Sequence, residues 1–229
     1  MKNKTQKRSP YVSIVIPTLN EESNIKTIIT EIKEVLVGYD YEIIVVDGNS
    51  TDSTVKIARS MGALVLFDNF GKGSALIRGF ATAKGSIIIS MDADLSHRPR
   101  ELKLLIAGIE AGYEVCMGSR FLTGGGTEDM PLLRQMGNKT FLLLVNSFFG
   151  STYSDLCYGY RAFSRNALKR LRLSEKGFGI ETEISIKAKK AKLRILEIPS
   201  YEKKRGEGDA KLRTLRDGYI ILKTIFRNL

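Results

Sequence analysis

The first half of the chain alternates between short apolar runs and longer segments in which apolar residues recur every three or four positions. The apolar runs favour buried strands over 12–17, 41–46, 63–67, 86–91 and 114–118. The periodic segments favour helices over 22–37, 53–61, 73–83 and 100–111. Strands separated by helices predict an α/β fold with a mostly parallel, Rossmann-like sheet and helices on both of its faces.

The second half of the chain is less regular. The same patterns favour helices over 132–148 and 180–191, and strands over 158–163 and 193–201. The glycines of 124–126 and the charged stretch 203–211 predict loops, and 212–229 has the pattern of a basic amphipathic helix. We therefore expect a basic tail over 1–10, one domain over 11–212 and a C-terminal helix over 213–229.

The charge balance narrows the classes of partner. The 229 residues are 43% hydrophobic, which is enough to bury a large core, and the net charge is +11. A basic protein attracts polyanions such as nucleic acid, anionic lipid or phosphorylated substrates. The chain has no Trp and no arginine-rich stripe with interleaved aromatics, so we expect no nucleic-acid partner.

The cysteines and the apolar stretches indicate in which cellular compartment the protein is found. Cys116 and Cys157 are far apart and not in a metal-binding or redox spacing, so we expect reduced thiols and a cytoplasmic protein. The longest apolar stretch, 141–149, contains Asn146 and Ser147 and is too short to span a bilayer.

Polar residues follow three of the predicted strands, at 18–21, 47–52 and 92–96. In parallel sheets ligands bind beyond the carboxyl ends of the strands. Asp92 and Asp94 lie two positions apart at such an end, so their carboxylates can converge on Mg²⁺ or Mn²⁺. A metal that bridges a diphosphate at this position would stabilise a leaving nucleoside diphosphate. A solvated turn is the alternative interpretation of the two aspartates.

Five motifs occur in order: VSIVIPTLNEE at 12–22, EIIVVDGNSTD at 42–52, GKG at 71–73, MDADL at 91–95 and GSRF at 118–121. Over 11–212 the chain resembles the family-2 glycosyltransferases of the GT-A fold. Within that family it looks most like the dolichyl-phosphate mannose synthase group and its polyprenyl-phosphate sugar transferase relatives. The later marks of this likeness are DLCYGYRAF at 155–163, ETE at 181–183 and the segment 205–212.

The resemblance implies a role for each matching position. The nucleoside pocket would be lined by Pro17, Leu19, Glu21 and Val46. The donor side would also include Gly48, Ala93 and Arg134. The metal would be held by Asp92, Asp94 and, weakly or through water, Ser96. The phosphates would be met by Arg120, Arg205 and Lys211.

The chain departs from the group's pattern at three positions. Gly48 stands where the mannose synthases usually have a second Asp, Ser96 where a Gln is common, and Ala210 where a Ser is expected. Both GDP-mannose and a UDP-hexose therefore remain candidate donors. The GKG motif lacks the spacing of a P-loop and favours a flexible turn before a helix. His97 would support the metal loop from behind.

A lipid monophosphate acceptor is already largely dianionic at neutral pH, so cations rather than a general base would be needed. The expected reaction is therefore a single inverting displacement of a hexose onto a polyprenyl (dolichyl-type) phosphate. Two alternatives stay open. With a hydroxyl acceptor, the candidate bases are Asp155, Glu181 and Glu183. The other alternative is a non-catalytic membrane-surface binding module.

The C-terminal helix suggests where the reaction takes place. Its apolar stripe consists of Leu212, Leu215, Tyr219, Leu222 and Phe226, widened by Ile221 and Ile225 and flanked by Arg213, Arg216, Lys223 and Arg227. Such a helix can lie in the headgroups of an anionic membrane, so we expect a peripheral protein on the cytoplasmic face. The stripe could equally pack on the protein's own sheet, and a membrane-anchored partner could supply the anchor instead.

Overall fold

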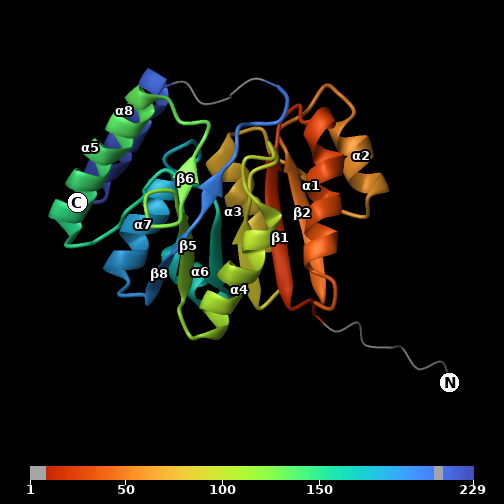
Figure 1. Ribbon diagram of the computed structural model, residues 1–229, viewed down its shortest axis with the longest axis horizontal. Helices are drawn as coiled ribbons and strands as arrows, with labels where there is room; N and C mark the ends of the chain where they lie inside the picture. The colour runs from red at the N-terminus through yellow and green to blue at the C-terminus, as the bar shows by residue number, and fades with distance from the viewer. Residues whose placement is uncertain (1–8, 209–213) are drawn as a thin grey trace.

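The computed structural model describes residues 9–208 and 214–229, and its centre is a seven-stranded sheet. The strands lie in the order β3 (Leu64–Phe67), β2 (Tyr41–Asp47), β1 (Val12–Thr18), β4 (Ile87–Ser90), β7 (Arg161–Ser164), β5 (Val115–Ser119) and β8 (Ile195–Pro199). All neighbours are parallel except β7, which runs antiparallel to both β4 and β5. The predicted mostly parallel sheet is confirmed (Figure 1). Its one reversed strand, β7, is the fifth of the seven.

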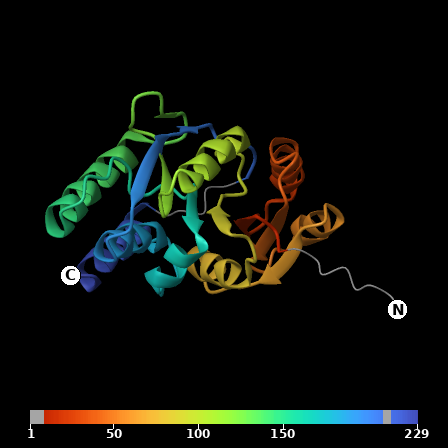
Figure 2. The same ribbon diagram turned by 90° about the horizontal axis from the view of Figure 1, so that it is seen from below.

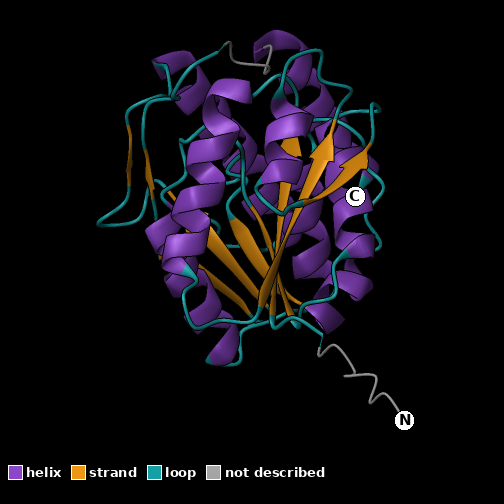
Figure 3. Cartoon of the chain, turned by 90° about the vertical axis from the view of Figure 1, so that its right-hand side faces the viewer, coloured by secondary structure: helices purple, strands orange, loops and turns teal. Residues whose placement is uncertain are grey.

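Helices cover both faces of the sheet, as predicted (Figures 2 and 3). One face packs on α1 (Glu22–Val35), α2 (Thr54–Ser60) and α4 (Leu102–Glu110), which follows the short 3₁₀ helix η1 (Pro99–Glu101). The other face packs on α3 (Lys72–Thr82), α6 (Arg165–Leu171) and α7 (Ile180–Lys190). Alternate residues of the central strands enter the two cores, as Ile14 and Val15 do, because successive side chains of a strand point to opposite faces.

Several elements of the second half differ from expectation. The strand predicted over 158–163 starts only at Arg161, and helix α6, which begins directly after it, was not predicted. Ser164 caps α6 by accepting a hydrogen bond from the Ala167 amide at 3.2 Å, a local signal that the apolar pattern does not contain. The glycine loop holds β6 (Gly126–Thr127), which pairs with β9 (Tyr201–Glu202) in a second, two-stranded sheet.

Helices α5 (Leu132–Phe149) and α8 (Thr214–Arg227) lie side by side on one flank of the molecule (Figure 1). The apolar stripe of α8 is divided between two environments. Ile221 and Ile225 are buried in the core, whereas Leu215 and Tyr219 are 86% and 68% exposed. One edge of the stripe therefore packs on the protein, and the other faces outward.

The described residues contain no helix that is both long and apolar enough to cross a bilayer. The predicted phosphate contact Lys211, and Leu212 and Arg213 of the predicted C-terminal helix, lie outside the described residues.

Candidate active site

A cavity of about 960 Å³ opens beyond the carboxyl ends of β1, β2 and β4, where the sequence places its polar loops. Most of the residues singled out from the sequence line it. They are Pro17, Leu19, Glu21, Gly48, Asp92, Ala93, Asp94, Ser96, Arg120, Arg134, Glu181 and Arg205. The structure thus brings together side chains that are up to 188 positions apart in the chain.

Three of the predicted residues do not line the cavity. Val46 is fully buried in the core, where its side chain packs near Gly79 of α3, so it does not reach the cavity. Asp155 and Glu183 are also buried, at 1% and 0% exposed, and bind neighbouring protein groups. Of the three candidate bases for a hydroxyl acceptor, only Glu181 faces the cavity.

The loop after β4 is fixed by its own hydrogen bonds. Oδ1 of Asp94 accepts from the Ser96 hydroxyl at 2.6 Å and from the Ser96 amide at 3.1 Å. The Asp92 amide donates to Nδ1 of His97 at 3.1 Å, and the His97 ring stacks on Tyr160 with the ring centres 4.7 Å apart. The buried His97 therefore supports the loop from behind, as predicted.

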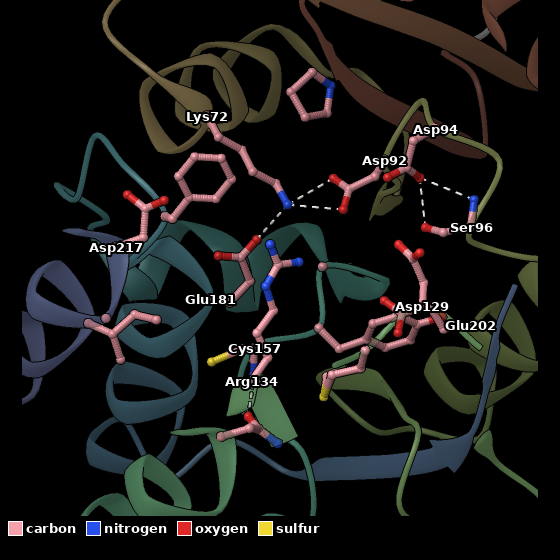
Figure 4. Close-up of a pocket in the computed structure, with 18 of the residues that line it drawn as sticks. Lys72, Asp92, Asp94, Ser96, Asp129, Arg134, Cys157, Glu181, Glu202 and Asp217 are labelled. Carbon is pink, nitrogen blue, oxygen red and sulfur yellow. Dashed lines mark hydrogen bonds and ion pairs between the residues drawn. The ribbon is translucent and has the colours of Figure 1, made fainter. Parts of the chain in front are cut away.

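Both carboxylates of this loop are bound to cationic side chains. The Lys72 ammonium lies 2.9 Å from Oδ1 and 3.0 Å from Oδ2 of Asp92, and 2.9 Å from Oε1 of Glu181 (Figure 4). Arg205 binds Oδ2 of Asp94 at 2.7 Å and reaches Oε1 of Glu21 at 3.4 Å. Charged side chains from five segments that are distant in sequence thus meet at one end of the cavity.

These pairs shift the protonation equilibria at the site. Burial alone would lower the pKa of Lys72, but the charges of Asp92 and Glu181 outweigh it and raise the pKa of the ammonium above its ordinary value. Burial alone would raise the pKa of Asp92, but Lys72, followed by His97 and Arg205, holds that pKa below its ordinary range. Lys72 is therefore charged and Asp92 ionised at neutral pH.

The oxygen atoms at this loop suit a hard divalent cation. Two carboxylates and the Ser96 hydroxyl are the ligand type that Mg²⁺ and Mn²⁺ prefer. Across residues 9–208 and 214–229, no three His, Cys, Asp or Glu side chains are arranged to hold a metal by themselves. Asp92 and Asp94 fit such a cation, which would need further oxygen ligands from outside the protein, as Mg²⁺ usually does.

Arg120 lines the cavity, but its guanidinium is bound to two protein carboxylates. Its Nε and Nη2 atoms bind the two oxygens of Asp155 at 2.7 and 2.9 Å, and Nη1 binds Glu202 at 3.0 Å. Burial works against the charge, but these carboxylates, Asp155 first, raise the pKa of the guanidinium further. Arg120 therefore joins the end of β5 to the 155 loop and to β9, and both neighbouring carboxylates balance its charge.

The sequence analysis missed Lys72 and the apolar wall of the cavity. The expected flexible turn at GKG is instead a close-packed helix start: a Cβ atom on Gly73 would lie 2.2 Å from the Glu175 carbonyl oxygen, and one on Gly71 2.6 Å from that of Lys176. Only glycine fits at these two positions, and the glycine-lysine-glycine pattern was the available signal. The apolar wall comes from α5 and α8 and the loop before α5, with Met130, Leu133, Met136, Phe141, Leu215, Tyr219 and Leu222.

The chain resembles known proteins in sequence. The chain is 33% identical over 226 residues to a dolichol-phosphate mannosyltransferase of Pyrococcus furiosus, covering 95% of this chain and 61% of that protein. It is 29% identical over 213 residues to a polyprenol monophosphomannose synthase of Mycolicibacterium smegmatis, covering 87% and 80% of the two chains. The chain thus spans about three fifths of the length of the Pyrococcus relative.

A solved structure shows the same fold. Glucosyl-3-phosphoglycerate synthase from Mycobacterium tuberculosis, in complex with Mn²⁺, UDP and glucosyl-3-phosphoglycerate, superposes with a TM-score of 0.76 at 23% identity, covering 96% of this chain and 80% of that one. The same enzyme has also been solved with Mg²⁺ and UDP. The sequence profile described as Glycosyl transferase family 2 matches residues 13–172. This chain belongs to glycosyl transferase family 2 and has the GT-A fold.

Proposed function

We propose that the chain is a metal-dependent, inverting hexosyltransferase that moves a hexose from GDP-mannose or a UDP-hexose to a polyprenyl phosphate. This proposal is supported mainly by one observation: the same cavity has a charged side and an apolar side. Asp92 and Asp94 lie on its charged side, and α5 and α8 line another side with apolar residues. A nucleotide diphosphate suits the first side and a lipid chain suits the second. The names of the Pyrococcus and Mycolicibacterium relatives support this pairing of substrates.

In this proposal the chain's own residues bind and align charge. Asp92 and Asp94 would hold Mg²⁺ or Mn²⁺, which when bound offsets the negative charge that builds on the leaving diphosphate. Arg205, Arg134 and Lys72 bring cationic groups to the cavity and would hold two phosphate groups within bonding distance. Lys211, outside the described residues, stays a predicted phosphate contact.

The reaction needs no base on the protein. A phosphate oxygen of the acceptor attacks the anomeric carbon, the bond from that carbon to the diphosphate oxygen breaks, and the electron pair leaves with the nucleoside diphosphate. Because the attack comes from the opposite side, the configuration at the carbon inverts. A hydroxyl acceptor would need a base, and Glu181, the one candidate that faces the cavity, is paired with Lys72.

The exposed side of α5 and α8 supports a membrane-surface location. On α5, Leu132, Met136 and Leu143 are 72%, 59% and 68% exposed, and the neighbouring helix α8 exposes Leu215 and Tyr219. The cations Arg216, Lys223 and Arg227 share this helix pair with them. We propose that this face rests on the cytoplasmic surface of an anionic membrane, where apolar burial and charge attraction add. A membrane-anchored partner protein remains the alternative anchor.

One assay tests the proposed activity. Purified protein is given GDP-mannose or UDP-hexoses, a polyprenyl phosphate in detergent, and Mn²⁺ or EDTA. We expect a glycosylated lipid phosphate with one donor, and no product in EDTA. Product formed only on a hydroxyl acceptor would favour the polysaccharide alternative, and absence of any donor turnover with Mn²⁺ would favour the binding module.

The metal ligands are tested separately by calorimetry with the donor alone. The Asp94→Ala variant should lose metal-dependent donor binding because a carboxylate ligand is gone. Asp40→Ala is the matched control, because Asp40 is exposed and lies before β2, at the opposite edge of the sheet. Donor binding that is the same in EDTA as in Mn²⁺ would contradict the metal assignment.

A further inference from the structure

Lys72 forms an ion pair with Asp92, one of the two proposed ligands of the divalent cation. Its ammonium contacts both oxygens of Asp92, at 2.9 and 3.0 Å. A divalent ion bound to either oxygen would therefore have the ammonium beside it. Only 17% of the Lys72 side chain is exposed, and a buried charge-assisted pair of this kind is costly to separate. The charge of the ammonium therefore opposes a divalent cation that approaches either oxygen of Asp92, and this opposition falls when the ammonium moves away.

The fold builds this position for Lys72. Gly71 and Gly73 allow the start of α3 to lie directly on the backbone of residues 175–177, and the Ser74 amide donates to the Lys176 carbonyl at 3.0 Å. That loop is in turn held by the carboxylate of Glu183, which accepts from the amides of Ser174 and Glu175 at 2.9 and 2.8 Å. Backbone packing thus fixes the position from which the Lys72 side chain extends into the cavity.

Glu181 gives the ammonium a second place to go. Its Oε1 atom lies 2.9 Å from the Lys72 nitrogen, on the side away from the metal loop (Figure 4). Apart from this ion pair, Oε1 is buried without a hydrogen-bond partner, so little else on the protein competes for it. A small rotation of the lysine side chain would leave it on Glu181 and free Asp92.

We propose that Lys72 competes with the divalent cation for Asp92, and that Glu181 keeps the displaced ammonium inside the cavity. This inference rests on the proposed metal role of Asp92. Its consequence is that a metal alone binds weakly, because it must first displace an internal cation. A metal that arrives with a nucleoside diphosphate binds better, because the phosphates offer the displaced ammonium a new partner.

The test is binding of Mn²⁺ alone, without nucleotide or acceptor, followed by the electron paramagnetic resonance signal of free Mn²⁺. The Lys72→Met variant keeps the length and apolar stem of the side chain but removes the competing charge. We expect it to bind Mn²⁺ at least about tenfold more tightly than the wild type, since loss of the competitor is worth about 1.4 kcal/mol or more. Adding UDP or GDP should tighten binding less in the variant than in the wild type.

Two controls separate competition from general charge effects. Lys176→Met removes an exposed cation from the neighbouring loop that does not contact Asp92 and should change the Mn²⁺ affinity by less than about twofold. Lys72→Arg keeps a cation and should keep the weak binding. If Lys72→Met fails to fold, Glu181→Gln serves instead: it leaves the ammonium with Asp92 alone and should weaken Mn²⁺ binding.

Each outcome decides between the proposals. Equal Mn²⁺ affinity in the wild type and Lys72→Met, or weaker binding in the variant, overturns the competition and makes Lys72 a brace for Asp92. Absence of Mn²⁺ binding in every variant, even with UDP or GDP present, overturns the metal role of Asp92 as well. Tighter binding in both Lys72→Met and Lys176→Met would reduce the effect to long-range charge and also count against the proposal.

Discussion

Arg120 and Arg205 bring the same charge to the same cavity but are held differently. Arg120 is 6% exposed, and its guanidinium binds Asp155 and Glu202. The Arg205 side chain is 19% exposed, and it binds Asp94 in the loop after β4. Motif matching gave both the same phosphate role, because a motif shows residue types but not the partners that surround them.

The two arginines should therefore behave differently when removed. Arg120→Ala leaves Asp155 buried without its cation and should cost about 3–5 kcal/mol of unfolding free energy. Arg205→Ala should leave the melting temperature nearly unchanged but lower turnover about tenfold, or ~1.4 kcal/mol of transition-state stabilisation. Thermal denaturation and an initial-rate assay on both variants check this. Full activity in Arg205→Ala would contradict its assignment to the chemistry.

Glu183 provides a prediction of pH dependence. Burial opposes its charge, but the hydrogen bond from Lys187 and those from Ser174 and Glu175 lower the pKa of the folded carboxyl below its ordinary value. Because the folded pKa is below the unfolded one, the stabilisation is present above the unfolded pKa and is lost as the pH falls through the folded pKa. The group therefore stabilises the fold at neutral pH and not in acid.

Glu183→Gln should accordingly lower the unfolding free energy at pH 7 by about 1–3 kcal/mol. The difference from the wild type should shrink below about pH 4.5, where the unfolded carboxyl binds a proton. Urea denaturation of both proteins from pH 7 down to pH 3.5 measures it. A difference that stays constant over this range would mean that the charge of Glu183 does not contribute.

At the scale of the elements, helix α8 shows what periodicity can and cannot decide. Its spacing of apolar residues predicts a helix correctly, but it does not say which neighbour the apolar stripe meets. The structure resolves this by packing Ile221 and Ile225 on the core next to α5 and α7, and by leaving Leu215, Tyr219 and Phe226 exposed. The sequence pattern contains no mark for that division, because both edges are equally apolar.

This division makes a sharper membrane test than deletion of the helix, which would also uncover the core. The triple variant Leu215→Ser, Tyr219→Ser and Phe226→Ser removes three apolar side chains from the exposed edge. Full burial of one such side chain in a membrane contributes at most roughly 1.5–3 kcal/mol to binding. We therefore expect the variant to bind anionic vesicles at least about tenfold more weakly. The melting temperature should hardly change. Co-sedimentation with vesicles at low and high salt gives the measurement, and Lys33→Ser on α1 is a distant control that removes a cation.

Unchanged vesicle binding in the triple variant would show that α8 does not face the bilayer. Binding that resists high salt equally in all proteins would instead mean that charge plays no part, against the contribution expected from Arg216, Lys223 and Arg227.

At the scale of the whole molecule, the sequence predicts the layers of the fold but not the order and direction of every strand in the sheet. Apolar runs separated by helical periods are enough to predict a mostly parallel sheet with ligands at its carboxyl edge. The run that contains β7 has no feature that shows its direction, so its antiparallel place between β4 and β5 could not be predicted. For the same reason the meeting of Lys72, Asp92 and Glu181, from three distant segments, follows only from the assembled fold.

The position of β7 also limits how relatives of this protein can be recombined. Chimeras could be made by joining the first half of one enzyme to the second half of another, with the junction in the loop around 124–126. In this chain such a junction would place a foreign β7 against β4, the strand that leads directly into Asp92. We therefore expect a chimera to fold best when 161–164 comes from the parent that supplies β4 and the loop of Asp92 and Asp94, because β4 and β7 pair directly.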